Sequence, residues 1–302
     1  MNEIINFLKI ENIDFEENVE GKRLCSFHVG GNVRLVVRPK TAGEFEVLYD
    51  YLLENQIKNI LLGRGTNVVI SDEGYDGVVV SLSALSRVDI DVTDDNCIVA
   101  GAGASMLKLA NFACENGLTG LEFAHGIPGS VGGGVYMNAG AYGGEIANVL
   151  VSCLVFDMIS GKIFLLYGDE CDYSYRHSIF MKNKNLVVLF ATFELSEGDP
   201  DEIKARMDEL KAKRVASQPL EYPSAGSTFK RPEGYFAGKL IEESGLKGYT
   251  IGGAQVSEKH AGFVVNRGDA TAEDIKNLVA HIQNTVKEKF DVSLECEIEF
   301  VE

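Results

Sequence analysis

Two glycine-rich stretches carry the residue types that hold phosphate groups and flat aromatic ligands. The first, residues 61–70, reads LLGRGTNVVI and places Gly63 and Gly65 directly after an apolar run. Successive backbone N–H groups in a glycine turn can form a concave site for an anion such as a pyrophosphate. An ordinary turn between two strands accounts for the same residues. A dinucleotide loop of the Rossmann type is not indicated, because the third glycine and the helix that must follow are missing.

The second stretch, residues 126–144, is much richer in glycine. It reads GIPGSVGGGVYMNAGAYGG, so eight of its 19 residues are glycine. Glycine lets the backbone approach a ligand closely, and a purely structural loop rarely needs so many. The stretch therefore predicts irregular backbone against a flat ligand.

Three later segments place a cation, a hydroxyl and a carboxyl group that could act in one reaction. YSYRHS contains Arg176, GSTFKRP contains Ser227 and LECEI contains Glu297. An arginine stabilises negative charge on a carboxylate, a serine can pass on a proton when its oxyanion is stabilised, and a glutamic acid with a raised pKa can donate a hydrogen bond. Taken singly, each has a plain alternative: a cation at a strand end, a turn serine, and a solvated strand edge shared with Glu295 and Glu299.

Together, in this order and spacing, the two glycine stretches and the three polar segments resemble the UDP-N-acetylenolpyruvoylglucosamine reductase family. The matching signatures are YRxS, GSxFKxP and LxxEV, and the resemblance extends from Gly30 to Phe300. This family is a branch of the superfamily with an FAD-binding domain of the vanillyl-alcohol-oxidase (PCMH) type. The chain is similar to the shorter type of the family, so no tyrosine that closes over the substrate is assigned.

The resemblance implies an NADPH-dependent reductase that converts UDP-N-acetylglucosamine enolpyruvate to UDP-N-acetylmuramate, a step of peptidoglycan precursor synthesis. Hydride from flavin N5 adds to C3 of the enolpyruvyl group, and a proton reaches C2. By the resemblance, Arg176 faces the substrate carboxylate, Ser227 delivers the proton to C2 and Glu297 acts at the enol.

The resemblance also assigns binding residues for the cofactor and the substrate. FAD is expected to bind non-covalently, with its pyrophosphate on the first glycine stretch and its ring on the second, rather than being attached through His28, His125 or Cys114. The residues expected to bind FAD are Gly63, Arg64, Gly65, Thr66, Asn67, Gly126, Ile127, Pro128, Gly129, Ser130, Gly132, Gly133, Asn138, Ala139, Gly140 and Gly143. The residues expected to bind the substrate are Tyr175, Lys230 and Arg231; some members carry asparagine at the position of Arg231, so its contact stays open.

Two other functions fit parts of the pattern. A different FAD enzyme of the superfamily, such as a hydroxy-acid dehydrogenase or a carbohydrate oxidase, would need a base rather than the protonating Ser227 with Lys230. A flavin-binding sensor without enzyme activity is the second alternative, and it would not oxidise NADPH.

The elements that position these residues are mixed helices and strands without strict βαβ alternation, which predicts an α+β fold. Helices are expected at 2–9, 41–56, 105–116, 201–215, 235–244 and 271–290, with Thr41 and Thr271 as N-caps. Strands are expected at 33–38, 59–62, 78–82, 97–100, 150–157, 162–167, 187–195, 262–266 and 293–301. We expect an N-terminal segment (1–29) that packs on a two-part FAD-binding domain (30–195), followed by a smaller α+β substrate-binding domain (196–302).

Composition limits the remaining classes of function. The net charge of −17 over 302 residues, without a basic run, argues against nucleic-acid binding. No apolar run approaches the roughly 20 residues of a membrane span, and no signal peptide is indicated. Six cysteines without CxxC spacing predict reduced thiols in a cytoplasmic protein, and no residues have metal-ligand spacing. The oligomeric state is left open, with a monomer as the expectation.

Overall fold

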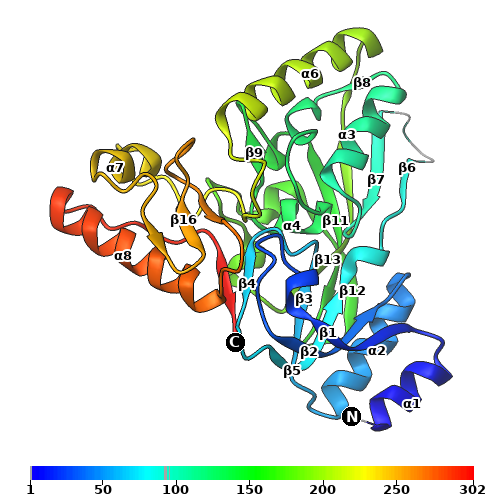
Figure 1. Cartoon of the computed structure of the whole chain (residues 1–302). Coiled ribbons are helices and arrows are strands. Elements are labelled where there is room, and N and C mark those ends of the chain that lie inside the picture. The colour runs from blue at the N-terminus through cyan, green and yellow to red at the C-terminus, as the bar shows by residue number, and fades with distance from the viewer. Residues whose placement is uncertain (1, 92–93, 95) are drawn as a thin grey trace. The chain divides into compact units, whose positions relative to one another are not determined.

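The structure, a computed structural model, describes residues 2–91, 94 and 96–302 (Figure 1). Two compact units are present, and each is assembled from three separate stretches of chain. The first unit comprises Met1–Glu16, Val36–Arg64 and Val78–Lys213, and the second comprises Glu17–Leu35, Gly65–Gly77 and Arg214–Glu302. Met1, which begins the predicted N-terminal segment, lies outside the described residues. The predicted functional boundaries at 29/30 and 195/196 stay a prediction.

An antiparallel sheet forms the centre of the first unit. Its five strands lie in the order β12-β11-β13-β7-β6. Their bounds are β6 (Val88–Ile90), β7 (Cys97–Gly101), β11 (Leu150–Asp157), β12 (Lys162–Tyr167) and β13 (Leu186–Glu194). Ser152 of β11 lies opposite Tyr167 of β12 and Thr192 of β13. The strands predicted at 150–157 and 162–167 are confirmed.

Helices α2 (Ala42–Glu54) and α3 (Met106–Glu115) form within ranges predicted as helices, and each buries apolar side chains. Ser105 caps α3, because its hydroxyl accepts a hydrogen bond from the Lys108 N–H at 3.0 Å. From α2, the Phe45 ring meets Phe156 of β11 edge-on at 5.3 Å. Helix α3 and the sheet thus share one apolar core in the first unit, and α2 packs on the sheet through Phe45 and Phe156.

The glycine stretch is partly regular, so the expectation of irregular backbone throughout is wrong. Residues Val131–Tyr136 form a short helix, α4, which Ser130 caps by accepting a hydrogen bond from the Gly133 N–H at 3.3 Å. A side chain at Gly132 would place its Cβ 2.8 Å from Cβ of Ala102, and one at Gly134 would lie 3.0 Å from the Met106 sulfur. Close tertiary packing thus overrides the low helix propensity of glycine.

The second unit contains a small antiparallel sheet and two helices. Strands β15 (Thr250–Ile251), β16 (Ala254–Val256) and β17 (Val264–Asn266) lie in that order, and α8 (Ala272–Phe290) packs on β15 and β16. Thr271 and Asp274 form the predicted capping box of α8, with 3.0 Å hydrogen bonds in both directions. The shorter helix of this unit is α7 (Ala237–Glu243).

The terminal strand is shorter than predicted. Only Glu299–Val301 form a strand, β18, which pairs in parallel with β4 (Val68–Ile70). Residues just before it pair instead with residues 228–230, so the predicted strand at 293–301 holds only at its end. Alternation of apolar and polar residues cannot tell a strand from an extended segment with a different partner.

The remaining elements complete an α+β protein, as predicted. A four-stranded sheet has the order β1-β2-β5-β3. The boundaries between the two units at 16/17, 35/36 and 77/78 fall within its strands β1, β2 and β5. The remaining bounds are α1 (Asn2–Ile10), β1 (Asp14–Glu20), β2 (Asn32–Arg38), β3 (Asn59–Leu62), β5 (Tyr75–Ser81), β8 (Leu118–Thr119), β9 (Gly140–Ala141), β10 (Gly144–Glu145), α5 (Ile179–Lys182), β14 (Ser196–Glu197) and α6 (Pro200–Ser217). Short 3₁₀ turns join several of them.

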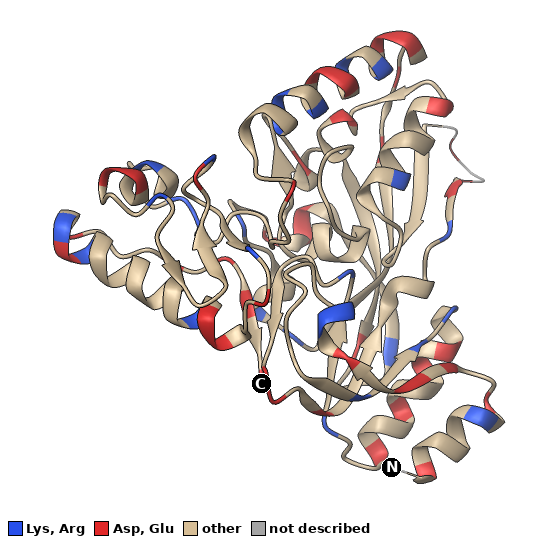
Figure 2. Ribbon diagram, in the orientation of Figure 1, with Lys and Arg blue, Asp and Glu red and all other residues tan. Residues whose placement is uncertain are grey.

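Charged residues of both signs are interspersed along the ribbon, and α6 shows this clearly (Figure 2). Lys204 pairs with Asp208 at 2.5 Å, and Lys213 pairs with Glu209 at 2.6 Å. In the part of the chain that the structure describes, no helix is both long enough and apolar enough to cross a bilayer.

Candidate active site

Arg176 lies in a tight two-residue turn of the first unit. Ser174 and His177 exchange both backbone hydrogen bonds, at 3.2 and 3.1 Å, so Tyr175 and Arg176 form the corner. Arg176 has a φ of 51°, in the left-handed region. Its guanidinium donates to the carbonyls of Asn138 at 3.4 Å and Gly140 at 3.2 Å. The structure thus brings the predicted catalytic arginine onto the second glycine stretch.

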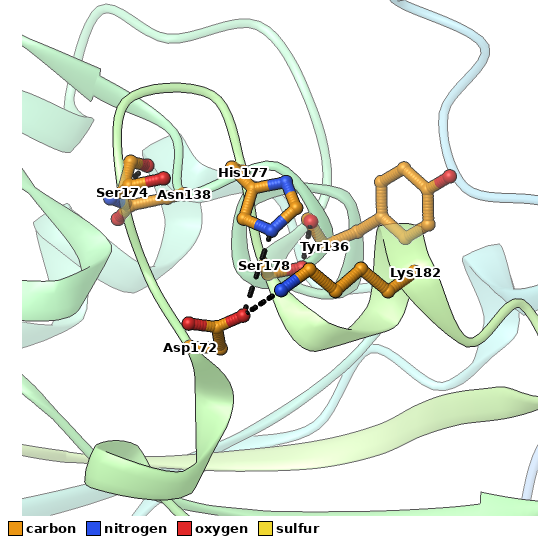
Figure 3. A network of polar contacts seen from close by, with 7 residues as sticks. All are labelled: Tyr136, Asn138, Asp172, Ser174, His177, Ser178 and Lys182. Carbon is orange, nitrogen blue, oxygen red and sulfur yellow. Dashed lines mark hydrogen bonds and ion pairs between the residues drawn. The ribbon is translucent and has the colours of Figure 1, made fainter.

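Asn138 connects that glycine stretch to the arginine turn (Figure 3). Its side chain is fully buried. The amide NH2 donates to the Ser174 carbonyl at 3.1 Å, and the amide oxygen accepts from the Ala147 N–H at 3.0 Å. Asn138 was predicted for its place in a flavin-binding motif; the sequence contains no signal for this contact with a turn 36 residues away.

Polar contacts on both sides of the turn hold its ends (Figure 3). Asp172 pairs with Lys182, and its carboxylate lies 3.8 Å from Nε2 of His177. Hydrogen bonds from Lys182 lower the pKa of the Asp172 carboxyl. The buried Ser178 hydroxyl donates to the Tyr136 carbonyl at the end of α4.

The two glycine stretches meet within the first unit. A Cβ added to Gly63 would lie 2.5 Å from Oγ of Ser130, the cap of α4. Gly143 has a φ of 92°, which favours glycine, in the turn between β9 and β10. Close backbone beside a buried hydroxyl suits a phosphate or a flat ring system, so the residues present fit the FAD that the motifs imply.

The first stretch continues into the second unit after Arg64. Gly65 has a φ of 65°, and a Cβ there would approach the Leu24 carbonyl to 1.8 Å. The Ser26 N–H also donates to the Gly65 carbonyl at 2.9 Å. Residues 24–26 were not among the predicted site residues, because no motif marks them.

The serine and acidic segments lie side by side in the second unit. The Glu297 N–H donates to the Thr228 carbonyl at 2.8 Å, and the Lys230 N–H donates to the Glu295 carbonyl at 2.9 Å. Ser227 is exposed and Glu297 is half-buried. The structure therefore pairs the backbones of the two segments that contain Ser227 and Glu297, which are 70 positions apart in sequence.

Asn67 holds the backbone at Glu297 and at Glu299. Its side-chain amide donates to the Glu297 carbonyl at 2.9 Å, and its carbonyl accepts from the Glu299 N–H at 2.9 Å. Thr66 precedes it and is half-buried. The end of the first glycine stretch thus adjoins the acidic segment.

Side chains of the serine and acidic segments beside Ser227 and Glu297 have different surroundings. Glu295 is 71% exposed and pairs with Nζ of Lys230 at 2.5 Å. Between the two glutamates, burial raises the pKa of the Cys296 thiol to about 11. Arg231 lies with its guanidinium over the Phe236 ring at 4.6 Å.

The predicted residues are divided between the two units, which are described separately. The first unit holds Gly63, Arg64, the residues predicted within 126–143, Tyr175 and Arg176. The second holds Gly65, Thr66, Asn67, Ser227, Lys230, Arg231 and Glu297. Within the described ranges, no three His, Cys, Asp or Glu side chains gather as a metal ion would require.

Two family models match separate parts of the chain. Residues 33–166 match the model of an FAD binding domain, and residues 218–301 match the model of the UDP-N-acetylenolpyruvoylglucosamine reductase C-terminal domain. The first match bears out the FAD-binding domain in the predicted fold class.

Individual relatives match over nearly their whole length. The chain is 50% identical to UDP-N-acetylenolpyruvoylglucosamine reductase of Clostridium novyi over 97% of this chain and 95% of that protein. It is 51% identical to that of Listeria innocua over 90% of each. The crystal structure of the reductase from Thermus caldophilus superposes with a TM-score of 0.81, covers 96% of this chain and 100% of that chain, and is 33% identical. The chain belongs to the UDP-N-acetylenolpyruvoylglucosamine reductase family.

Proposed function

We propose that the chain is an FAD-dependent oxidoreductase that reduces UDP-N-acetylglucosamine enolpyruvate to UDP-N-acetylmuramate, with NADPH as the donor. One observation supports this function above the others. The serine segment and the terminal acidic segment pair through the Thr228 carbonyl and the Glu297 N–H at 2.8 Å. The segments that supply a hydroxyl and a carboxyl group, both of which this reduction requires, are therefore neighbours in the fold.

The FAD residues proposed here are those assigned by resemblance, from Gly63 to Asn67 and within 126–143. Their support is the tight glycine backbone beside Ser130 in the first unit and beside Leu24 in the second. When bound, the flavin supplies the hydride for C3, which it has received from NADPH. We propose that this binding is non-covalent.

Arg176 stabilises the negative charge that spreads into the substrate carboxylate once C3 is reduced. A guanidinium provides planar N–H donors that match a carboxylate. Its two hydrogen bonds to main-chain carbonyls, at 3.4 and 3.2 Å, hold it without neutralising its charge. This role is a proposal that the geometry supports.

Ser227 delivers the proton to C2. A serine is a weak acid, so its oxyanion needs a nearby cation, and Lys230 is three residues away in the same segment. Glu297 acts in its protonated form, because an ionised carboxylate would oppose the negative charge on the substrate.

The substrate residues proposed are Tyr175, Lys230 and Arg231. Tyr175 is exposed at the corner of the arginine turn, and the Arg176 guanidinium lies 5.3 Å from its ring centre. Lys230 and Arg231 bring positive charge to the serine segment, which suits a diphosphate.

We propose residues 30–195 as the FAD-binding domain and 196–302 as the substrate-binding domain; the two family matches support this division.

We also propose a monomer that works in the cytoplasm. A sugar nucleotide and a nicotinamide nucleotide are metabolites of that compartment, which supports the location. Light scattering of the purified protein tests the monomer.

The decisive experiment follows the flavin spectrum of the purified protein without oxygen. NADPH should bleach a yellow flavin band, and the enolpyruvyl sugar nucleotide should restore it. Rapid recovery with oxygen but none with the sugar nucleotide would instead support an oxidase. A flavin that NADPH does not bleach would support a sensor.

A further inference from the structure

The backbone of Arg176 adopts a conformation that its residue type disfavours. A φ of 51° places it in the left-handed region, where a side chain meets the neighbouring carbonyl and glycine is preferred. Such residues persist only where the surroundings hold them, and they concentrate at functional sites. The contacts that hold this turn therefore bear on what Arg176 does.

One buried residue contacts the turn at two points. The Asn138 side chain donates to the Ser174 carbonyl at 3.1 Å, and the Asn138 carbonyl accepts from the Arg176 guanidinium at 3.4 Å. The side chain is also fixed at its other end by the Ala147 N–H at 3.0 Å. Asn138 thus hydrogen-bonds both the first residue of the turn and the guanidinium of its arginine.

The ion pair between Asp172 and Lys182 beside the turn is of a weaker kind. The Asp172 side chain is 55% exposed and that of Lys182 is 61% exposed, and exposed ion pairs contribute little. The Asn138 amide, in contrast, has no exposed surface, so its hydrogen bonds do not compete with water.

We propose that Asn138 is a positioning residue for Arg176. Its buried amide holds the Tyr175–Arg176 turn against the glycine stretch and thereby keeps the guanidinium where the substrate carboxylate arrives. The inference rests on the proposed role of Arg176 in the second half-reaction, the reduction of the enolpyruvyl sugar.

The test uses variants that tolerate the backbone at this position. Asn138 itself has a φ of 47°, which glycine accepts, so Asn138→Gly removes the amide without adding strain. Ser178→Ala is the matched control, because it removes one buried hydrogen bond between the same two segments, to Tyr136 rather than to Ser174. Arg176→Ala and the double variant Asn138→Gly/Arg176→Ala complete a double-mutant cycle.

The two half-reactions are measured separately by anaerobic stopped-flow at the flavin band, at saturating NADPH and then at saturating enolpyruvyl sugar nucleotide. Asn138→Gly should slow the second half-reaction by about 10- to 100-fold, since a displacement of about 1 Å can have that effect. Asn138 also belongs to the proposed flavin stretch, so the inference requires that Asn138→Gly slow the first half-reaction at least about tenfold less than the second. Both half-reactions of Ser178→Ala should stay within about threefold of the parent. The double variant should be no slower than Arg176→Ala alone, because Asn138 acts through that arginine.

Three outcomes would overturn the inference. Multiplication of the two single effects in the double variant would show that Asn138 acts independently of Arg176. An equal loss in both half-reactions would show that Asn138 acts on the flavin alone and not through Arg176. A normal second half-reaction in Arg176→Ala would contradict the proposed role of the arginine itself. This single variant therefore distinguishes failure of the proposed function from failure of the inference about Asn138.

Asn138→Asp provides a second route if the glycine variant does not fold. A protonated carboxyl group can replace the amide donor to the Ser174 carbonyl, whereas an ionised one repels it. The second half-reaction of this variant should therefore slow as pH rises through the pKa of the new carboxyl, relative to the parent at each pH. A constant ratio to the parent would contradict the inference.

Discussion

At the scale of single residues, Ser227 is exposed at the start of a segment whose backbone is fixed by its neighbour. The Thr228 N–H donates to the Gly262 carbonyl at 2.9 Å, and the Thr228 carbonyl accepts from Glu297. The buried Thr228 hydroxyl accepts from the Val264 N–H at 3.0 Å. Removing the Ser227 hydroxyl should consequently leave the backbone of the segment in place.

Ser227→Ala should leave reduction of the flavin by NADPH intact and slow its reoxidation by the enolpyruvyl sugar. A positioned general acid contributes about 10²–10⁴-fold, equivalent to roughly 3–5 kcal/mol of barrier. Substrate affinity should change little, because the hydroxyl acts in the transition state. Anaerobic stopped-flow of each half-reaction is the measurement.

Ser224→Ala is the control for this prediction, since Ser224 is a half-buried serine in the same segment whose carbonyl accepts from the Ser26 hydroxyl at 2.6 Å. It should behave as the parent. Reoxidation of Ser227→Ala within a few-fold of the parent would show that another group supplies the proton.

The Cys296 thiol should show an unusual pH dependence. Burial raises its pKa from 9.0 to about 11, so the thiol form persists to higher pH. Alkylation by iodoacetamide, followed by mass spectrometry of the labelled peptide, should accelerate about tenfold per pH unit from pH 8 to 10. A rate that levels off near pH 9 would mean an ordinary thiol, and Cys296→Ser identifies the signal.

At the scale of elements, the contact between the two glycine stretches should matter for the cofactor. Gly63→Ala places a methyl group 2.5 Å from the Ser130 hydroxyl, so Ser130 or the loop must move. Flavin affinity should fall by at least about tenfold, equivalent to about 1.4 kcal/mol. Flavin titration, with urea unfolding of the apoprotein, separates binding from stability.

Gly43→Ala in the first turn of α2 is the matched control. Its new methyl group would have only the Thr41 hydroxyl within reach, at 4.0 Å. It should leave flavin affinity unchanged and stabilise the protein by up to about 1 kcal/mol. Equal flavin affinity in Gly63→Ala and Gly43→Ala would show that the first glycine stretch does not bind the cofactor.

Helix α8 should depend on a carboxylate 200 residues away in sequence. Asp72 accepts hydrogen bonds from the Ala272 N–H at 2.8 Å and the Glu273 N–H at 3.0 Å, at the positive end of the helix dipole. Asp72→Ala should therefore lower the free energy of unfolding by about 1–2 kcal/mol. Asp76→Ala removes an exposed ion pair with Arg34 and should change stability by at most about 0.5 kcal/mol. Urea denaturation monitored by circular dichroism compares them, and equal effects would deny Asp72 this role.

At the scale of the whole molecule, the flavin should be released intact when the protein is denatured. Two residues that could attach flavin covalently have polar contacts within the protein instead. Nδ1 of His125 lies 3.1 Å from Oδ1 of Asn111, and the buried Cys114 thiol donates to the Pro200 carbonyl at 3.6 Å. Burial also lowers the pKa of the His125 imidazole. After acid precipitation, FAD should be found in the supernatant. Flavin that stays with the precipitated polypeptide would contradict the prediction.

Local chemistry along the chain determined most of the secondary structure. Ser105 and Thr271 accept hydrogen bonds from residues three positions ahead, so each cap could be predicted from its own segment. The buried apolar residues of α8 recur at helical spacing, so this face also follows from its own segment. The resemblance in motifs and spacing predicted Arg176, Ser227 and Glu297 as catalytic residues, although their individual residue types allowed structural roles as well.

Only the tertiary structure decided which distant segments meet. It made residues 131–136 of a glycine stretch helical, limited the last strand to Glu299–Val301, and paired Thr228 with Glu297. It also placed the Asn138 amide on the Ser174 carbonyl. A capping bond depends on side chains within one turn, which the sequence specifies directly. Contacts between distant segments depend on which packing buries the most apolar surface and satisfies the most backbone groups, and that is a property of the whole chain.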